Sequence, residues 1–379
     1  MTAPDLSVVV VNFNSTIYMD GLLASLLDEP IALNGGRATV EVILIDNASR
    51  DEDHEKLERL SSRPEVRLIR NTENVGYAIG NLQGLAVAQG RWHLVSNPDI
   101  YVRSGCVATL IDAVEALPGP AVVGPMASFD PDGHVLLPPI ELADPYKEAL
   151  TEIGRHQDSV ARYAIRRRAQ DAHQFWTASE PIRLPMLSGQ FFLARRETFL
   201  QHGLFDPAYP LYYEDTDLFR RYGEADIGLW HVPTARIVHH FSRSAMGRPN
   251  ASMFRNRVGA RRYFRKFWGA PGERTFNNLH ARADAIAADD ECPFDLEVVE
   301  AADQPPTISI PDVEGVYLET AGNPKFSLAA GVFPGVAGPF TFPVTFWGQL
   351  GPMEFWCRAV EPATGDSLRT WKIVKCPAT

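Results

Sequence analysis

Asparagine and aspartate side chains follow three separate apolar runs of this sequence. Asn12-Phe13-Asn14 follows the first run, Asp46-Asn47 follows the second, and Asn97-Pro98-Asp99 follows a later one. Each group alone is typical of a turn or a helix N-cap, because Asn and Asp favour those positions. If the runs are strands of an open α/β sheet, however, the three groups lie at the edge where such sheets bind ligands. Together they form a candidate ligand site.

The elements that would position these groups alternate between strand-like and helical patterns. Alternation of this kind predicts an α/β fold with right-handed crossovers and a mostly parallel sheet. The predicted strands are Leu6–Val11, Val40–Ile45, Val66–Arg70, Trp92–Ser96, Ala121–Met126, Gln190–Ala194 and Ala235–Val238. The predicted helices between them are Ile17–Leu27, Tyr77–Gln89 and Cys106–Leu117.

The rest of the chain departs from this alternation in three places. Asp158–Ala172 is an Arg-rich helical segment, which we interpret as an excursion from the sheet. Met253–Trp268 is predicted to be a helix rich in arginine and aromatic residues, and 269–293 a linker with a short helix. From 294 to 379, short β-like runs alternate with Gly, Pro and Asn, which predicts a small β-sandwich-like module. We therefore expect a first domain over 1–268 and a second over 294–379.

Composition bounds the class of protein. The 379 residues include 36 Lys and Arg against 47 Asp and Glu, so the net charge is −11. The acidic balance argues against a general nucleic-acid binder. The four cysteines are far apart and form no CxxC pair, so we expect neither a disulfide framework nor a zinc knuckle. A reducing, cytoplasmic location fits best.

Targeting and membrane signals are weak. The opening residues MTAPDLSVVVVNFN lack the basic region of a signal peptide and lead directly into a strand-like run. No apolar stretch approaches the ~20 residues that span a bilayer.

The sequence lacks the nucleotide-binding motifs GxGxxG and GxxxxGK[ST], so the main sequence evidence for a Rossmann dinucleotide-binding protein or a P-loop protein is missing. A nucleotidyltransferase would need a Gly-rich basic loop after the first strand, and 12–16 contains no Gly, Lys or Arg.

Several sequence fragments together resemble the family 2 glycosyltransferases of the GT-A fold, and are most similar to their rhamnosyltransferase-like branch. Their order and spacing agree over residues 5–268, whereas 290–379 lies outside the resemblance. The fragments are SVVVVNFNS (7–15), VILIDNASRD (42–51), NTENVGYAIGN (71–81), SNPDI (96–100), LSGQFFLARRETF (187–199), GLFDPAYPLYYEDTDLFRR (203–221) and ARIVHHFSRS (235–244).

The resemblance implies a site for a nucleoside diphosphate sugar. Asp46 matches the aspartate that reads a pyrimidine base, so a dTDP- or UDP-linked donor is expected. Gly76 would let the backbone approach the nucleotide, and the helix after it would point its N-terminus at the site. The implied donor-binding residues are Asn12, Phe13, Asp46, Asn74, Gly76, Tyr77, Asn97, Gly189 and Gln190.

The resemblance also implies a divalent metal, Mg²⁺ or Mn²⁺, that bridges the diphosphate. Asn97-Pro98-Asp99 stands at the DxD position, but the first acid is an amide. Asp99 can still offer a hard oxygen ligand, and His239 matches the histidine that completes the metal shell. His240 is a weaker alternative ligand. A turn without metal remains open for 97–99.

The catalytic base implied by the resemblance lies in Tyr213-Glu214-Asp215-Thr216-Asp217. Asp215 matches the base that removes the acceptor hydroxyl's proton in an inverting transfer, and Glu214 is the alternative. A carboxylate among other acids has a raised pKa when it is partly desolvated, which suits a base near neutrality. The acids also suit a helix start, and we expect only this role for Asp217.

The expected activity is inverting transfer of a sugar, with rhamnose as best guess, to a glycan or lipid-linked glycan. A UDP-linked hexose or galactofuranose donor and a non-catalytic glycan- or nucleotide-binding protein are the alternatives. Residues 253–268 could contact an anionic membrane surface at its inner face, or could equally be a packing helix with a solvated basic face. The C-terminal module would bind acceptor glycan or mediate self-association into a homo-oligomer.

Overall fold

The structure is a computed structural model of the whole chain, and it describes residues 3–33, 36–209, 211–239, 249–285 and 291–377, with 249–254 as backbone only. The chain divides into two compact units. Unit 1 comprises Met1–Met126, Ile140–Leu142 and Ser179–Tyr263. Unit 2 comprises Ala127–Pro139, Ala143–Ala178 and Phe264–Thr379. This division does not follow the expected boundaries at 268 and 293, because 127–139 and 143–178 fold with the C-terminal strands.

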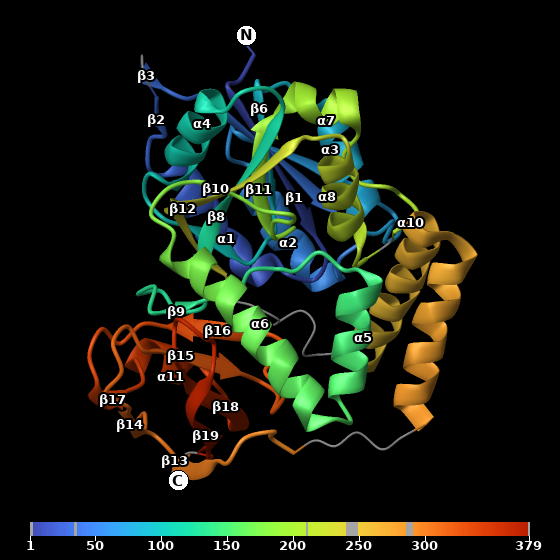
Figure 1. Cartoon of the computed structure of the whole chain (residues 1–379). Helices are drawn as coiled ribbons and strands as arrows, with labels where there is room; N and C mark the ends of the chain where they lie inside the picture. The colour runs from blue at the N-terminus through green and yellow to red at the C-terminus, as the bar shows by residue number, and fades with distance from the viewer. Residues whose placement is uncertain (1–2, 34–35, 210, 240–248, 286–290, 378–379) are drawn as a thin grey trace. The chain divides into compact units, whose positions relative to one another are not determined.

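Unit 1 is built on a mostly parallel sheet, as predicted (Figure 1). Its strand order is β8-β11-β6-β1-β4-β5, with β1 parallel to β4 and β6 and β4 parallel to β5. β11 runs antiparallel to β6 and β8, and β12 pairs antiparallel with β7 and β10. The bounds are β1 Leu6–Asn12, β4 Val40–Asp46, β5 Val66–Arg70, β6 Trp92–Ser96, β7 Ile100–Val102, β8 Ala121–Ser128, β10 Ile182–Arg183, β11 Phe191–Arg195 and β12 Gly228–His239. A separate pair comprises β2 Ala32–Leu33 and β3 Gly36–Arg37.

Helices pack on this sheet and bury its central strands. Every residue of β1 is buried, as expected for a strand covered on both faces. Gly84 of α3 lies so close to β1 that an added Cβ would be 2.4 Å from a Val9 methyl group. Glycine there lets the helix approach the sheet. The helices are α1 Thr16–Leu27, α2 Asp51–Ser61, α3 Tyr77–Val87, α4 Cys106–Ala116, α7 Arg196–His202, α8 Glu214–Glu224 and the first part of α10 Pro249–Ala285.

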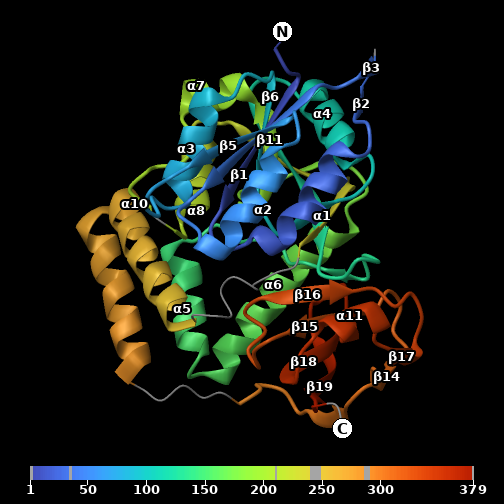
Figure 2. The same ribbon diagram turned by 180° about the vertical axis from the view of Figure 1, so that it is seen from behind.

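The strands of unit 2 pair in the order β13-β19-β18-β15-β16-β9, and β14 and β17 form a separate antiparallel pair (Figure 2). Phe342, Phe346, Trp347 and Phe355 lie in its main hydrophobic cluster. The strands are β9 Val135–Leu136, β13 Glu297–Ala301, β14 Thr307–Ile310, β15 Tyr317–Ala321, β16 Ala329–Val332, β17 Gly338–Thr341, β18 Met353–Val360 and β19 Ser367–Lys375. The helices are α5 Pro145–Gly154, α6 Asp158–Thr177, α11 Val344–Gln349 and the rest of α10.

Two expectations for this region were wrong. A strand was predicted through 340–346, but β17 ends at Thr341 and α11 begins at Val344. Residues 269–293 were predicted to be a linker with a short helix, but α10 extends through this segment to Ala285, so most of its described residues are helical. Gly269 has φ 64° and ψ −160° inside this span, so two helices meet there at a kink. Pro271 follows this kink, at a place where a proline interrupts the hydrogen bonding of a helix.

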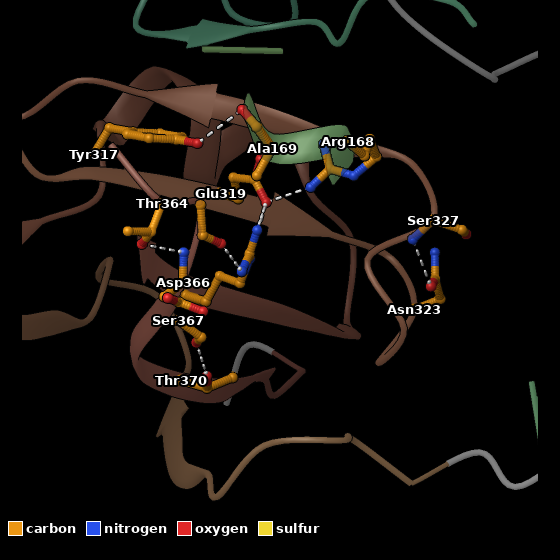
Figure 3. Close-up of polar contacts among 12 residues, drawn as sticks. Arg168, Ala169, Tyr317, Glu319, Asn323, Ser327, Thr364, Asp366, Ser367 and Thr370 are labelled. Carbon is orange, nitrogen blue, oxygen red and sulfur yellow. Dashed lines mark hydrogen bonds and ion pairs between the residues drawn. The ribbon is translucent and has the colours of Figure 1, made fainter. Parts of the chain in front are cut away.

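The Arg-rich segment is α6, and its charged side chains contact the strands of unit 2. The Arg168 guanidinium donates to the Glu319 carboxylate, which also accepts from Arg358 Nε at 2.9 Å and Nη2 at 2.7 Å (Figure 3). The Tyr317 hydroxyl donates to the Ala169 carbonyl at 3.2 Å. From the sequence, this Arg-rich segment was interpreted as an excursion from the sheet. In the structure, its Arg168 side chain joins helix α6 to a β-strand of unit 2.

Candidate active site

The carboxyl ends of β1 and β4 bring Asn12 and Asp46 together. The two residues are register partners, and both are almost completely buried. Asn12 Nδ2 lies 3.2 Å from Asp46 Oδ1 and 3.0 Å from Ser49 Oγ. The Asp46 carboxylate is thereby held in one orientation, as a residue that reads a ligand must be.

The loops beside this pair carry the other predicted nucleotide contacts. Phe13 is 43% exposed, although it follows a fully buried strand. Asn74 is exposed, and its Oδ1 accepts from the Gly76 amide at 2.9 Å. Gly76 immediately precedes α3 and has φ 90°, a backbone conformation that glycine adopts readily and residues with a side chain do not. Asn47 Nδ2 donates to the Gly76 carbonyl at 3.0 Å and fixes this loop to the end of β4.

Tyr77 links three segments that are far apart in the sequence. Its hydroxyl lies 3.0 Å from Asn97 Oδ1 and 3.4 Å from the Gly189 carbonyl. Burial raises the pKa of the Tyr77 hydroxyl, and the Glu214 carboxylate raises this pKa further. Tyr77 therefore stays protonated and joins the 97–99 turn to the segment that contacts the acids of α8.

Asp99 and His239 face each other at the ends of their segments. Asp99 immediately precedes β7, and His239 is the last residue of β12, the antiparallel partner of β7. His239 Nε2 lies 3.3 Å from Asp99 Oδ1, and both side chains are over 90% buried. One hard oxygen and one imidazole nitrogen at this separation are a donor pair that could hold one divalent ion together with further ligands. His240 lies outside the described residues.

Among the residues that the structure describes, two other groups of acids and histidines lie in unit 2. Asp130, Asp132 and His134 form one, and Glu148, Glu152 and His280 form the other. In the second group both ring nitrogens of His280 face carboxylates, at 2.6 Å from Glu148 and 3.8 Å from Glu152. His280 therefore contacts carboxylates on both sides of its ring. Neither group includes a residue predicted to bind metal.

Glu214 and Asp215 open α8. Glu214 is 6% exposed, and its Oε2 has no hydrogen-bond partner among the described residues. Burial raises the pKa of Glu214 to about 8, and the neighbouring Asp215 carboxylate adds to this. Burial also raises the pKa of Asp215, although the Thr216 amide donates to its Oδ1 at 2.7 Å. The acids thus have the elevated pKa values that suit proton transfer near neutrality.

Gly189 lies directly against the Asp215 side chain. A Cβ at 189 would be 2.7 Å from both Asp215 Cβ and Oδ2, so no other residue fits without displacement of the acid. The neighbouring Gln190 carbonyl accepts from the Asn97 amide at 2.8 Å. The predicted pair at 189–190 therefore joins the acid turn to the 97–99 turn through backbone contacts.

Sequence reasoning missed two features of the site. Ser49 holds both Asn12 and the Asn14 amide, and its only signal was its place in the DNAS sequence after β4. Tyr212 and Tyr213 both have φ 67°, in the left-handed region that residues with side chains rarely adopt.

Asp217 is in the first turn of α8 as expected, and its Oδ2 accepts from Arg221 Nε at 2.8 Å.

Comparisons with known proteins identify relatives of this chain. Residues 7–203 match the family model "Glycosyl transferase family 2". N-acetylglucosaminyl-diphospho-decaprenol L-rhamnosyltransferases from two strains of Mycobacterium tuberculosis are 32% identical over 268 residues, which cover 65% of this chain and 79% of the relative.

Solved structures show lower similarity. The mannosyltransferase PcManGT from Pyrobaculum calidifontis, in complex with GDP-Man and Mn²⁺, has a TM-score of 0.45 and 18% identity over 75% of this chain and 70% of that one. GalNAc-T7 with UDP, GalNAc and Mn²⁺ has a TM-score of 0.44 and 19% identity over 63% of this chain. The match spans less than half of GalNAc-T7, at 44% of its length.

Proposed function

Because the chain belongs to glycosyl transferase family 2, as its match over 7–203 and its rhamnosyltransferase relatives show, we propose an inverting transfer of rhamnose to a glycan or lipid-linked glycan hydroxyl. The proposed donor is a dTDP- or UDP-linked sugar. The name of the relatives supports rhamnose and a lipid-linked acceptor. The observation that carries the site is the adjacent pair of a buried Glu214 and a partly buried Asp215, whose raised pKa values suit a base for the acceptor hydroxyl.

In this proposal each group of the site has one task. Asp46, oriented by Asn12, accepts the imide N–H of a pyrimidine base, and the exposed Phe13 ring lines the base and ribose. Asp215 accepts the proton of the attacking hydroxyl and keeps its place against Gly189. An inverting displacement needs only one such base.

We propose that Asp99 and His239 hold Mg²⁺ or Mn²⁺ together with the donor diphosphate. A divalent ion there would neutralise charge on the leaving diphosphate. Asn97 supplies no carboxylate, and its Oδ1 is engaged by Tyr77, so the metal site has one acidic ligand fewer than a DxD pair. We therefore expect the ion to bind tightly only with the nucleotide present.

A thermal-shift panel tests the donor. We expect dTDP or UDP to raise the melting temperature, and GDP and CDP to do so much less, because a ligand that binds only the folded state stabilises it. Asp46→Asn should lose the preference while an Asp5→Asn control, at an exposed contact with Thr39, retains it. An equal shift with a purine diphosphate would contradict base recognition by Asp46.

EDTA and Asp99→Ala test the metal. We expect both to abolish transfer, and the variant to lose its response to added Mn²⁺. Full activity in chelator would mean that the enzyme is metal-independent and that Asp99 is a turn residue.

The proposed location is the cytoplasm, with peripheral contact at the inner face of the membrane. Among the described helices, none combines the length and apolar character needed to cross a bilayer. Support comes from the lipid-linked substrate in the relatives' name, and from the exposed basic residues Arg255, Arg261, Arg262, Arg265 and Lys266 of α10. Tyr263 and Phe264 of the same helix are buried, so these two aromatic side chains serve packing.

A further inference from the structure

The turn that carries Glu214 and Asp215 has an unusual backbone. Tyr212 and Tyr213 occur in succession with φ 67°, and Tyr213 has ψ −2°. Such conformations are unfavourable for residues with a Cβ, and they persist only when surrounding contacts impose them. Something must therefore hold these two tyrosines in place.

The contact that holds the turn comes from α10. A Cβ added to Gly259 would lie 2.8 Å from the Tyr212 carbonyl oxygen and 3.2 Å from Tyr213 Cβ. No side chain fits there, so the bare helix backbone lies directly against the left-handed pair. Glycine is a poor residue for a helix interior, and this close approach supplies a physical reason for its presence at this position.

The next turn of the same helix face continues the contact. Tyr263, four residues after Gly259, is completely buried, and its ring centroid lies 5.4 Å from that of Tyr213. Ala260 between them is 2% exposed. Residues four apart share one face of a helix, so Gly259 and Tyr263 form a continuous surface against the turn.

On the other side, Asp215 lies against Gly189, which leaves no room for a Cβ. The acid turn is therefore held between two glycines from distant segments of unit 1. Movement of either contact would change the direction in which Asp215 points.

We propose that Gly259 and Tyr263 of α10 are positioning residues, which impose the left-handed Tyr212–Tyr213 turn and thereby aim Asp215 at the acceptor. This inference rests on the proposed role of Asp215 as the base. Nothing in it requires α10 to touch the donor or the acceptor. Its consequence is a selective loss of turnover, because the helix positions the acids and not the nucleotide site.

The test compares Gly259→Ala with Gly223→Ala in the full chain. Gly223 lies within α8, the helix that carries the acids, and a Cβ there meets nothing within 4 Å, so it controls for a glycine-to-alanine change in a helix without a clash. For Gly259→Ala we expect kcat for dTDP release from dTDP-rhamnose to fall about 10- to 100-fold, as small misplacements of a reacting group do. The Kd for dTDP should stay within about twofold of the unchanged chain. Gly223→Ala should match the unchanged chain in both.

Tyr213→Gly combined with Gly259→Ala provides a rescue. It removes the Tyr213 Cβ, one of the two atoms that an alanine at 259 would crowd, and leaves the Tyr212 carbonyl oxygen in place. Because glycine at 213 adopts positive φ freely, the turn can shift away from the new side chain, and the double variant should recover part of kcat. If Gly259→Ala fails to fold, Tyr263→Leu replaces it, with kcat lowered and the Kd for dTDP unchanged. A kcat equal to that of the Gly223→Ala control in whichever of the two variants folds would overturn the proposal.

A readout without catalysis separates this inference from the proposed function. Glu214 can be followed by NMR titration of ¹³C-labelled glutamate, with its signal assigned by its loss in Glu214→Gln. We expect its pKa near 8 in the unchanged chain and nearer the ordinary glutamate range in Gly259→Ala, because a loosened turn admits water. If the chain turns over no donor, this shift still supports the positioning role, and its absence refutes it. If transfer occurs but Asp215→Asn leaves it intact, the base assignment fails separately.

Discussion

Two buried glutamates, one in each unit, have opposite environments. Glu319 on β15 is fully buried between the Arg168 and Arg358 guanidinium groups. Burial alone would raise its pKa, but the positive charges of Arg168 and then Arg358 lower the pKa below the ordinary value. Glu214 at the start of α8 is nearly as buried, but its charged neighbour is Asp215, and its pKa rises to about 8. Burial disfavours both carboxylates, so the sign of the neighbouring charge decides the direction of the shift.

The difference separates a structural acid from a reactive one. The lowered pKa of Glu319 keeps its carboxylate ionised near neutrality, and this carboxylate joins α6 to a strand of unit 2. Glu214 changes protonation near neutrality beside the proposed base. A strongly raised pKa in a pair of neighbouring acids indicates a candidate functional site. An acid paired with two arginines instead forms a structural ion pair that joins two elements.

The largest expected effect is on Glu319. Glu319→Gln leaves two buried guanidinium groups without a counter-charge, and should lower the free energy of unfolding by about 3–5 kcal/mol. Glu297→Gln is the control, because Glu297 pairs with Arg369 in an exposed contact of 2.7 Å. It should cost at most ~1 kcal/mol. Urea unfolding measures both, and equal losses would mean that the Glu319 cluster adds nothing beyond a surface pair.

Truncation of Arg168 should have a smaller effect, since Arg358 still pairs with Glu319. We expect Arg168→Met to cost about 1.5–3 kcal/mol, the usual value of a hydrogen bond to a charged group. Arg166→Met on the same helix is the matched control, because Arg166 pairs with Asp366 and is 51% exposed. Thermal unfolding should separate the two by several degrees. A larger loss in Arg166→Met would contradict the ranking by burial.

Glu214→Gln should stabilise the protein by about 1–3 kcal/mol at pH 8, because it removes a buried carboxylate that has no counter-charge among the described residues. The folded pKa of Glu214 lies above its unfolded value, so the folded state binds more protons and the penalty grows as pH rises from about 4.5 toward 8. The gain should therefore vanish near pH 4.5. Glu224→Gln, at the exposed end of α8, should show no such pH dependence. A gain that is constant with pH would show that Glu214 has an ordinary pKa.

The sequence predicted the central sheet well because buried parallel strands are continuous apolar runs, as in β1 and β4. It also predicted that Asn12, Asp46 and Asp99 follow such strands, and the register of β1 and β4 brings the first two into contact. The contact between Gly189 and Asp215 could not be predicted from the sequence, because 25 residues separate the two and their approach depends on how the chain between them folds. The contact of α6 with Glu319 could not be predicted from the sequence either. An arginine that pairs with a buried acid has the same spacing along a helix as an arginine that faces solvent.

The measurement that tests the account most directly is transfer by Asp215→Asn, compared with Glu214→Gln, alongside dTDP binding. The amide keeps the shape of Asp215 but cannot accept a proton, so transfer should fall at least about 100-fold with near-normal affinity for dTDP. If Asp215→Asn keeps its rate and Glu214→Gln loses it, the two roles are reversed. Normal turnover in both variants would contradict the account and leave the acidic pair as a helix start alone.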